Sequence, residues 1–187
     1  YLFFGPPGTG KTSVAYALAG ELRLKLCALS LTNPKLTDNV MADLLQRTPP
    51  RSLILIEDID AFFNAREKQD TRIQISFSGL LNAIDGVGAQ EGRIVVLTTN
   101  HRELLDAALI RPGRIDLEVE LGNATPAQLR GLLLRFFPEA AERIEPLVSA
   151  YPTRLLSPAQ IQQVLIAADN LDEAAVALQA LFTAASS

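Results

Sequence analysis

A glycine-rich segment near the N-terminus constrains the fold of this chain more than any other feature. Residues 5–12 read Gly-Pro-Pro-Gly-Thr-Gly-Lys-Thr and satisfy the phosphate-loop pattern G-x-x-x-x-G-K-[ST]. A short apolar run, Tyr1–Phe4, precedes the loop, and a segment with helical spacing, Lys11–Leu22, follows it. In this order the backbone N–H groups of the loop and the N-terminus of the helix face the same anion. The motif therefore predicts an α/β fold with a phosphate-binding site.

Length and composition set the class of protein. The chain has 187 residues, of which 48% are apolar and 20% charged, so it can bury a core as one globular domain or as one domain with a small appendage. Its net charge of −4 does not suit a surface that neutralises a nucleic-acid backbone. Its single cysteine, Cys27, lies in an apolar stretch and is expected to be a buried thiol in a reducing compartment.

The start of the sequence leads us to expect a fragment that is trimmed at the front. The chain begins with Tyr1, not Met, and runs at once into the phosphate loop, so we expect residues upstream of it. No apolar run approaches the ~20 residues needed to cross a bilayer. We therefore expect contact with a membrane only through segments outside this sequence.

Short apolar runs alternate with helical patterns along the first two thirds of the chain. The runs predict buried parallel strands at Tyr1–Phe4, Leu24–Leu31, Ser52–Ile56 and Arg93–Thr98. A fifth strand, Ile115–Leu121, alternates apolar and acidic residues, as an edge strand does. Helical spacing intervenes at Lys11–Leu22, Val40–Leu45 and from Phe77 to Ile84, and Asn64–Thr71 is expected to be a polar loop. The prediction is a three-layer α/β domain with a parallel five-stranded sheet.

The last third of the chain is predicted to be entirely helical. Thr125-Pro126-Ala127-Gln128 and Ser157-Pro158-Ala159-Gln160 are capping boxes with proline at the first helical position. Leu171, Ala174, Ala175 and Leu178 share one face of a final amphipathic helix. We place a domain boundary after Gly122, with an α/β nucleotide-binding part at residues 1–122 and a small helical lid at residues 123–187.

The phosphate loop supplies the predicted nucleotide-binding residues. Lys11 is suited to bridge the β- and γ-phosphates, and the hydroxyl of Thr12 is suited to bind Mg²⁺. The complete predicted set is Gly5, Pro6, Pro7, Gly8, Thr9, Gly10, Lys11, Thr12 and Ser13.

Polar residues follow two of the predicted strands. Glu57 and Asp58 end the run that begins at Ser52, where carboxylates can hold Mg²⁺ and polarise a water, although acids also cap strands at protein surfaces. Asn100 ends the next run and can orient the attacking water or contact the γ-phosphate, but asparagine also ends strands by turn preference. His101 is the sole histidine, without a cysteine nearby, and is expected to serve the loop and not a metal.

Two arginines lie on a rigid Pro-Gly turn. Arg111-Pro112-Gly113-Arg114 precedes the predicted edge strand. Guanidinium groups stabilise charge on a phosphoryl group in transfer, and the alternative is that both arginines are simply solvated.

Together these segments resemble the AAA module of ring ATPases. The resemblance is carried by residues 5–12, 57–58, 99–100 and 105–116. Residues 77–87, 98–101 and 122–126 further resemble the Bcs-type AAA ATPases, and the whole resemblance covers nearly the entire chain. Those proteins are chaperones of the mitochondrial inner membrane that help place the Rieske iron–sulfur protein into the cytochrome bc complex, and they have bacterial relatives.

The resemblance implies roles for individual residues. It makes Lys11 and Thr12 the Walker A pair, with ATP and Mg²⁺ as ligands, and Asn100 the first sensor. Glu57 falls at the metal-associated position and Asp58 at the water-polarising one, an order opposite to the commoner Asp-Glu. Arg111 and Arg114 would be arginine fingers that reach the nucleotide of a neighbouring subunit in a homo-oligomeric ring.

The resemblance also indicates what the ring acts on. Threading unfoldases of this superfamily carry an aromatic residue after the second strand, but no aromatic residue occurs here between Tyr16 and Phe62. The implied function is an ATPase that moves a folded protein client, in the assembly of a respiratory complex. The compartment would be the matrix side of the mitochondrial inner membrane in a eukaryote and the cytoplasm in a bacterium.

Three other functions are kept as alternatives. The first is a nucleic-acid-associated ATPase of the clamp-loader or helicase type, against which the acidic charge balance argues. The second is a monomeric small-molecule kinase or GTPase, although residues 98–102 lack the lysine and aspartate of a guanine-reading Asn-Lys-x-Asp segment. The third is a regulatory nucleotide-binding module with slow turnover.

Overall fold

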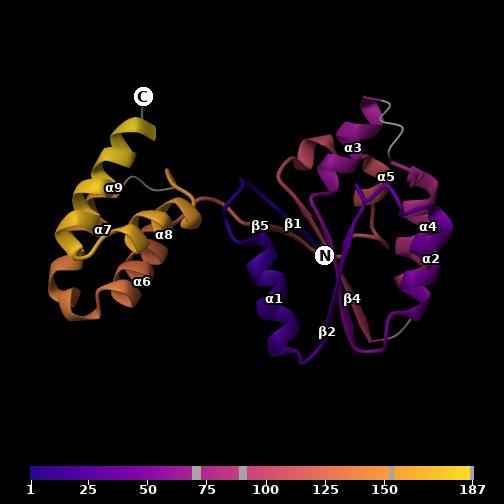
Figure 1. Ribbon diagram of the computed structural model, residues 1–187, viewed down its shortest axis with the longest axis horizontal. Helices are drawn as coiled ribbons and strands as arrows, with labels where there is room; N and C mark the ends of the chain where they lie inside the picture. The colour runs from indigo at the N-terminus through magenta and orange to yellow at the C-terminus, as the bar shows by residue number, and fades with distance from the viewer. Residues whose placement is uncertain (69–72, 89–91, 152–153, 186–187) are drawn as a thin grey trace. The chain divides into compact units, whose positions relative to one another are not determined.

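The chain forms two compact units. The computed structural model describes residues 1–68, 73–88, 92–151 and 154–185, and Figure 1 shows its helices and strands. The first unit comprises Tyr1–Gly5 and Lys11–Glu120, and the second comprises Pro6–Gly10 and Leu121–Ser187.

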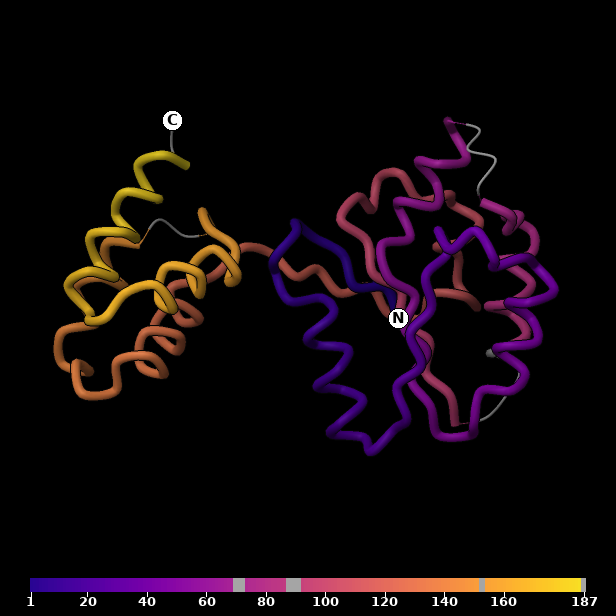
Figure 2. Tube along the Cα trace, viewed as in Figure 1, coloured from indigo at the N-terminus to yellow at the C-terminus, as the bar shows by residue number. Residues whose placement is uncertain are grey.

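The first unit is built on a five-stranded sheet. Its strands are β1 (Leu2–Phe4), β2 (Lys25–Ser30), β3 (Ser52–Glu57), β4 (Arg93–Thr99) and β5 (Glu118–Glu120). They are parallel and lie in the order β2-β3-β4-β1-β5. From β1 the chain crosses to the edge strand β2 and returns through β3 and β4, as Figure 2 traces. This order brings the carboxyl ends of β1, β3 and β4 together, which is where an open α/β sheet places its ligands.

Helices cover both faces of this sheet. Along β3, Ile54 and Ile56 belong to the core formed with α2 (Asp38–Arg47), α3 (Ile59–Glu67) and α4 (Phe77–Gly88). Because side chains alternate along a strand, Leu53 and Leu55 face the other side, where α1 (Lys11–Glu21) packs on the sheet. Figure 1 shows α1 on one side of the strands and α2 and α4 on the other. The predicted three-layer α/β fold is confirmed.

The described part of the second unit is helical. It contains α6 (Pro126–Phe136), the 3₁₀ segment η2 (Pro138–Arg143), α7 (Ile144–Ala150), α8 (Pro158–Ala167) and α9 (Leu171–Ala185). Both predicted capping boxes are formed, at Thr125 and at Ser157. Its core is separate from that of the first unit and includes Leu129, Ile161 and Leu178.

Three expectations from the sequence are wrong in detail. The second strand, β2, is parallel but not buried, because it is an edge of the sheet and its residues are exposed or half-exposed. Cys27, on this strand, is accordingly half-buried. Within the expected polar loop at 64–71, residues up to Glu67 belong to α3, and residues 69–71 lie outside the described part.

None of the described helices has both the length and the hydropathy of a transmembrane segment.

Candidate active site

The phosphate loop adopts a backbone that only glycine accepts easily. Gly8 and Gly10 have φ of +76° and +94°, the left-handed region that is strained for residues with a Cβ. The Thr9 hydroxyl closes the loop on itself by donating to the Pro6 carbonyl at 2.9 Å. Within the second unit, the Ala159 N–H at the start of α8 donates to the Gly8 carbonyl at 3.1 Å.

Lys11 connects the loop to the end of β4. Its ammonium donates to the Gly5 carbonyl at 2.8 Å and to Oδ1 of Asn100 at 2.7 Å, and the residue is buried. Burial lowers the pKa of Lys11 from its ordinary value, and the negative charges of Asp58 and Asp60 oppose this shift. The structure thus brings Lys11 and Asn100, 89 residues apart in sequence, into direct contact.

Thr12 lies against the last residue of β3. Its hydroxyl donates to Oε1 of Glu57 at 2.6 Å. Mg²⁺ in phosphate-transfer sites is held by one or two protein oxygens together with substrate phosphates and waters, so these two side chains are a suitable donor set. Among the described residues no cluster of three His, Cys, Asp or Glu side chains offers an alternative site for a metal.

Asp58 occupies a strained turn directly after β3. Its backbone is left-handed, with φ of +48°, and it is the N-cap of α3. The turn is fastened to β4, because the Asp58 N–H donates to the Thr98 hydroxyl at 3.1 Å. The side-chain amide of Asn100 donates to Oδ1 of Asp58 at 3.3 Å. Two predicted site residues therefore face each other across the ends of β3 and β4.

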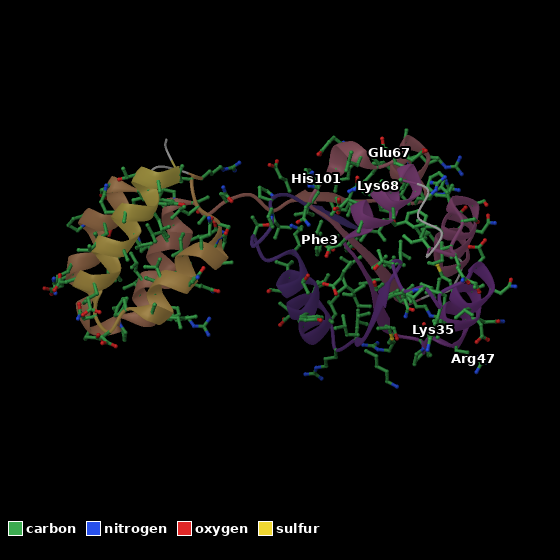
Figure 3. The ribbon with its side chains drawn as sticks, turned by 45° about the horizontal axis from the view of Figure 1, so that its top comes forward. Phe3, Lys35, Arg47, Glu67, Lys68 and His101 are labelled. Carbon is green, nitrogen blue, oxygen red and sulfur yellow. The ribbon has the colours of Figure 1, made fainter. Side chains whose placement is uncertain are left out.

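The ends of β3 and β4 are held together by residues that were not among the predicted site residues. Besides Thr98, a buried carboxylate, Asp60, accepts hydrogen bonds from the Thr99 hydroxyl and the Asn100 N–H. The sequence signal for Asp60 is that it is the third acid in the segment 57–60, two residues after Asp58. His101 contributes an exposed contact, its Nδ1 lying 2.9 Å from Oε1 of Glu103, and Figure 3 labels it.

The two arginines of the Pro-Gly turn differ in their surroundings. Arg114 forms a bidentate pair with Asp85 of α4, with both N–O distances 2.8 Å, and donates to the Ala108 carbonyl at 2.6 Å. Only 8% of its side chain is exposed. Arg111, at the end of α5 (Ala107–Ile110), is exposed. The turn therefore presents Arg111 to the solvent and uses Arg114 to hold itself on α4.

Comparison with known proteins identifies the family of this chain. Residues 1–123 match the family described as "ATPase family associated with various cellular activities (AAA)". The chain belongs to the AAA family of ATPases, and the predicted resemblance is confirmed.

Relatives within this family are more specific. The chain is 47% identical over 163 residues to the "Probable mitochondrial chaperone bcs1" of Schizosaccharomyces pombe. The matched segment covers 84% of this chain and 36% of that protein. It is 45% identical over 172 residues to the "Mitochondrial chaperone BCS1" of Homo sapiens, and this match covers 87% of this chain and 41% of the human protein. An "AAA-ATPase At3g50940" of Arabidopsis thaliana is 34% identical over 187 residues, and this match covers 92% of this chain and 40% of the plant protein. The chain thus spans less than half the length of these curated relatives.

Proposed function

We propose that this chain is the ATP-hydrolysing domain of a BCS1-type chaperone. The observation that supports it most is the convergence of four side chains at the phosphate loop. Lys11 contacts Asn100 at 2.7 Å, and Thr12 contacts Glu57 at 2.6 Å. A loop that binds phosphates, a donor set for Mg²⁺ and a polar group beside the γ-phosphate position are what ATP hydrolysis requires.

Each residue has a proposed part in this reaction. The backbone N–H groups of residues 5–13 and the Lys11 ammonium bind the β- and γ-phosphates. Thr12 and Glu57 would hold Mg²⁺, which would neutralise charge on the phosphates. Asp58 and Asn100 orient a water molecule toward the γ-phosphorus, and Asp58 attracts its proton. The water oxygen forms a bond to the γ-phosphorus as the bond from that phosphorus to the β,γ-bridging oxygen breaks. The bridging oxygen leaves with ADP, and the products are ADP, inorganic phosphate and the proton that Asp58 has attracted from the water.

The proposed setting is a ring of identical subunits that acts on a protein client. Arg111 is exposed on a rigid turn and is suited to reach a neighbour's nucleotide, whereas Arg114 holds the turn through Asp85. The relatives' names, mitochondrial chaperones, favour a protein client over a nucleic acid and a mitochondrial location. The Bcs-type resemblance adds a respiratory complex as the destination of the client and the matrix side of the inner membrane as the place of action.

The division of labour between Glu57 and Asp58 tests the proposal. Asp58→Asn in the full-length protein should still bind MgATP but nearly stop its turnover, because only the charge of the water-orienting group is lost. Glu57→Gln should raise the Mg²⁺ concentration needed for half-maximal turnover. Both are measured as phosphate release against ATP and Mg²⁺ concentration.

Asp43→Asn is the matched control, since Asp43 is an exposed carboxylate that pairs with Arg47 on α2, away from the described residues of the proposed site. It should keep full turnover. If the two active-site variants exchange their effects, the assigned roles are reversed while the ATPase proposal holds. A full-length protein without ATP turnover would overturn the proposal itself.

A further inference from the structure

Asp60 is a buried carboxylate directly behind the proposed site. It is the second residue of α3, only 7% exposed, and follows Ile59, which is fully buried. A buried charge is costly unless hydrogen bonds compensate it. The partners of Asp60 therefore indicate why a carboxylate stands at this position.

Among the described residues, the hydrogen-bond partners of the Asp60 side chain lie at the end of β4. One oxygen, Oδ1, accepts from the Thr99 hydroxyl at 2.7 Å and from the Asn100 N–H at 3.0 Å. Thr99 is completely buried, and its hydroxyl also accepts from the His101 N–H at 3.0 Å. Residues 99–101 are thus fastened to the start of α3 through a single carboxylate oxygen.

The residue fastened in this way is the one that connects the two halves of the site. The Asn100 side chain accepts from Lys11 through Oδ1 at 2.7 Å and donates to Asp58 through Nδ2 at 3.3 Å. The Asn100 amide can make both contacts, its oxygen toward Lys11 and its nitrogen toward Asp58, only while the Asn100 backbone stays in this position. Because Asn100 is the first residue after β4, the sheet itself does not hold it.

We propose that Asp60 is a positioning residue that holds Asn100 between Lys11 and Asp58 during ATP hydrolysis. It acts as a hydrogen-bond acceptor for the Thr99 hydroxyl and the Asn100 backbone, and it touches no substrate atom. This inference rests on the proposed ATPase function.

A competing explanation is that the charge of Asp60, and not its hydrogen bonds, matters to the site. Its negative charge counteracts the lowering of the Lys11 pKa that burial causes. Asp60→Asn separates the two explanations, because asparagine keeps an oxygen at Oδ1 and loses the charge. Asp60→Ala removes both.

Steady-state ATP turnover of the full-length protein provides the first test. Asp60→Ala should lower kcat by roughly 10²-fold, the cost of misplacing a catalytic group by about 1 Å, with KM nearly unchanged. Asp60→Asn should keep most of the original kcat. Combining Asp60→Ala with Asn100→Ala should add little to the loss from Asn100→Ala alone, because Asp60 is proposed to act only through the position of the Asn100 side chain.

Thr99 provides a second pair of variants in case Asp60→Ala does not fold. Thr99→Val has the same shape but no hydroxyl to donate to Asp60, whereas Thr99→Ser keeps the hydroxyl. Thr99→Val should lower kcat with KM nearly unchanged. Thr99→Ser should keep most of the original kcat.

Amide hydrogen exchange at Asn100 supplies a readout that needs no turnover. Asp60→Ala, or Thr99→Val in its place, should speed this exchange, and Asp60→Asn should not. The proposal is overturned if Asp60→Asn loses as much kcat as Asp60→Ala, if the losses at 60 and 100 multiply, or if exchange at Asn100 is unchanged. Because amide exchange does not depend on turnover, it tests whether Asp60 holds the Asn100 backbone even if the protein does not hydrolyse ATP.

Discussion

At the scale of single residues, the proposed site contains a lysine that is removed from solvent. Lys11 is 7% exposed and is held by a loop carbonyl and by the amide oxygen of Asn100. Desolvation lowers its pKa, yet the nearby carboxylates of Asp58 and Asp60 favour the charged form. Because the Lys11 ammonium is already largely removed from water, binding of phosphate oxygens to it carries little further free-energy cost of desolvating the ammonium.

Replacement of this lysine should mainly affect nucleotide binding. Lys11→Ala should weaken ATP binding at least about tenfold, or about 1.4 kcal/mol, because the backbone N–H groups alone then face the charge of the γ-phosphate. Calorimetric titration measures the change. Lys25→Ala, an exposed lysine on β2, should bind ATP as the unsubstituted protein does. Unchanged affinity in Lys11→Ala would contradict the assignment of the loop.

At the scale of elements, an ion pair joins α4 to the turn between α5 and β5. Asp85 lies on α4, and the Arg114 guanidinium both pairs with it and donates to the carbonyl of Ala108, the second residue of the short helix α5. The hydrogen bond from Arg114 is the main reason that the pKa of Asp85 lies below its ordinary value of 3.8. The same pairing raises the pKa of Arg114. The pair therefore fixes the turn that carries Arg111.

The stability that this pair contributes should depend on pH in one direction. A carboxyl with a lowered folded-state pKa stabilises the protein above its unfolded-state value, and this contribution is lost as pH falls through the folded-state value. Asp85→Asn should thus lower the melting temperature at neutral pH. The difference from the unsubstituted protein should shrink as pH falls below the ordinary value of 3.8. Thermal melts across pH measure it, and a difference that is constant with pH would contradict the role of the ion pair.

At the scale of the whole molecule, the proposed ring requires that one subunit completes the site of another. The described contacts of Lys11, Thr12, Glu57 and Asn100 are made within one unit of one chain. The proposed arginine finger, Arg111, is exposed and belongs to the turn that Arg114 holds in place. A finger acting in trans stabilises the transition state only after assembly, and arginine fingers raise turnover by about 10³-fold or more.

Mixing experiments distinguish a ring from a monomeric enzyme. Specific activity of the full-length protein should rise with protein concentration, and Arg111→Ala should lower turnover while ATP affinity and melting temperature stay nearly unchanged. Arg114→Ala should lower both turnover and melting temperature, because it also releases the turn from Asp85. A mixture of Arg111→Ala and Lys11→Ala proteins should regain activity, since each supplies what the other lacks. Turnover independent of concentration, with no recovery on mixing, would show that Arg111 does not act in trans.

Local sequence patterns determined much of this protein. The phosphate loop is a contiguous segment whose glycines and lysine specify its backbone and its ligand within a few residues. The capping boxes at Thr125 and Ser157 specify the starts of α6 and α8 for the same reason, since each involves residues three apart. The α/β class and most strand positions also follow from local periodicity.

The tertiary structure decided which of these segments meet. The contacts of Asp60 with Thr99 and of Arg114 with Asp85 join residues 39 and 29 positions apart, and no local pattern specifies such partners. Likewise, β2 has the apolar composition of an inner strand, but its exposure follows from its place at the edge of the sheet. Strand order and the side chains that it brings together depend on packing of the whole unit, because the free energy of each contact includes the loss of chain entropy between distant segments.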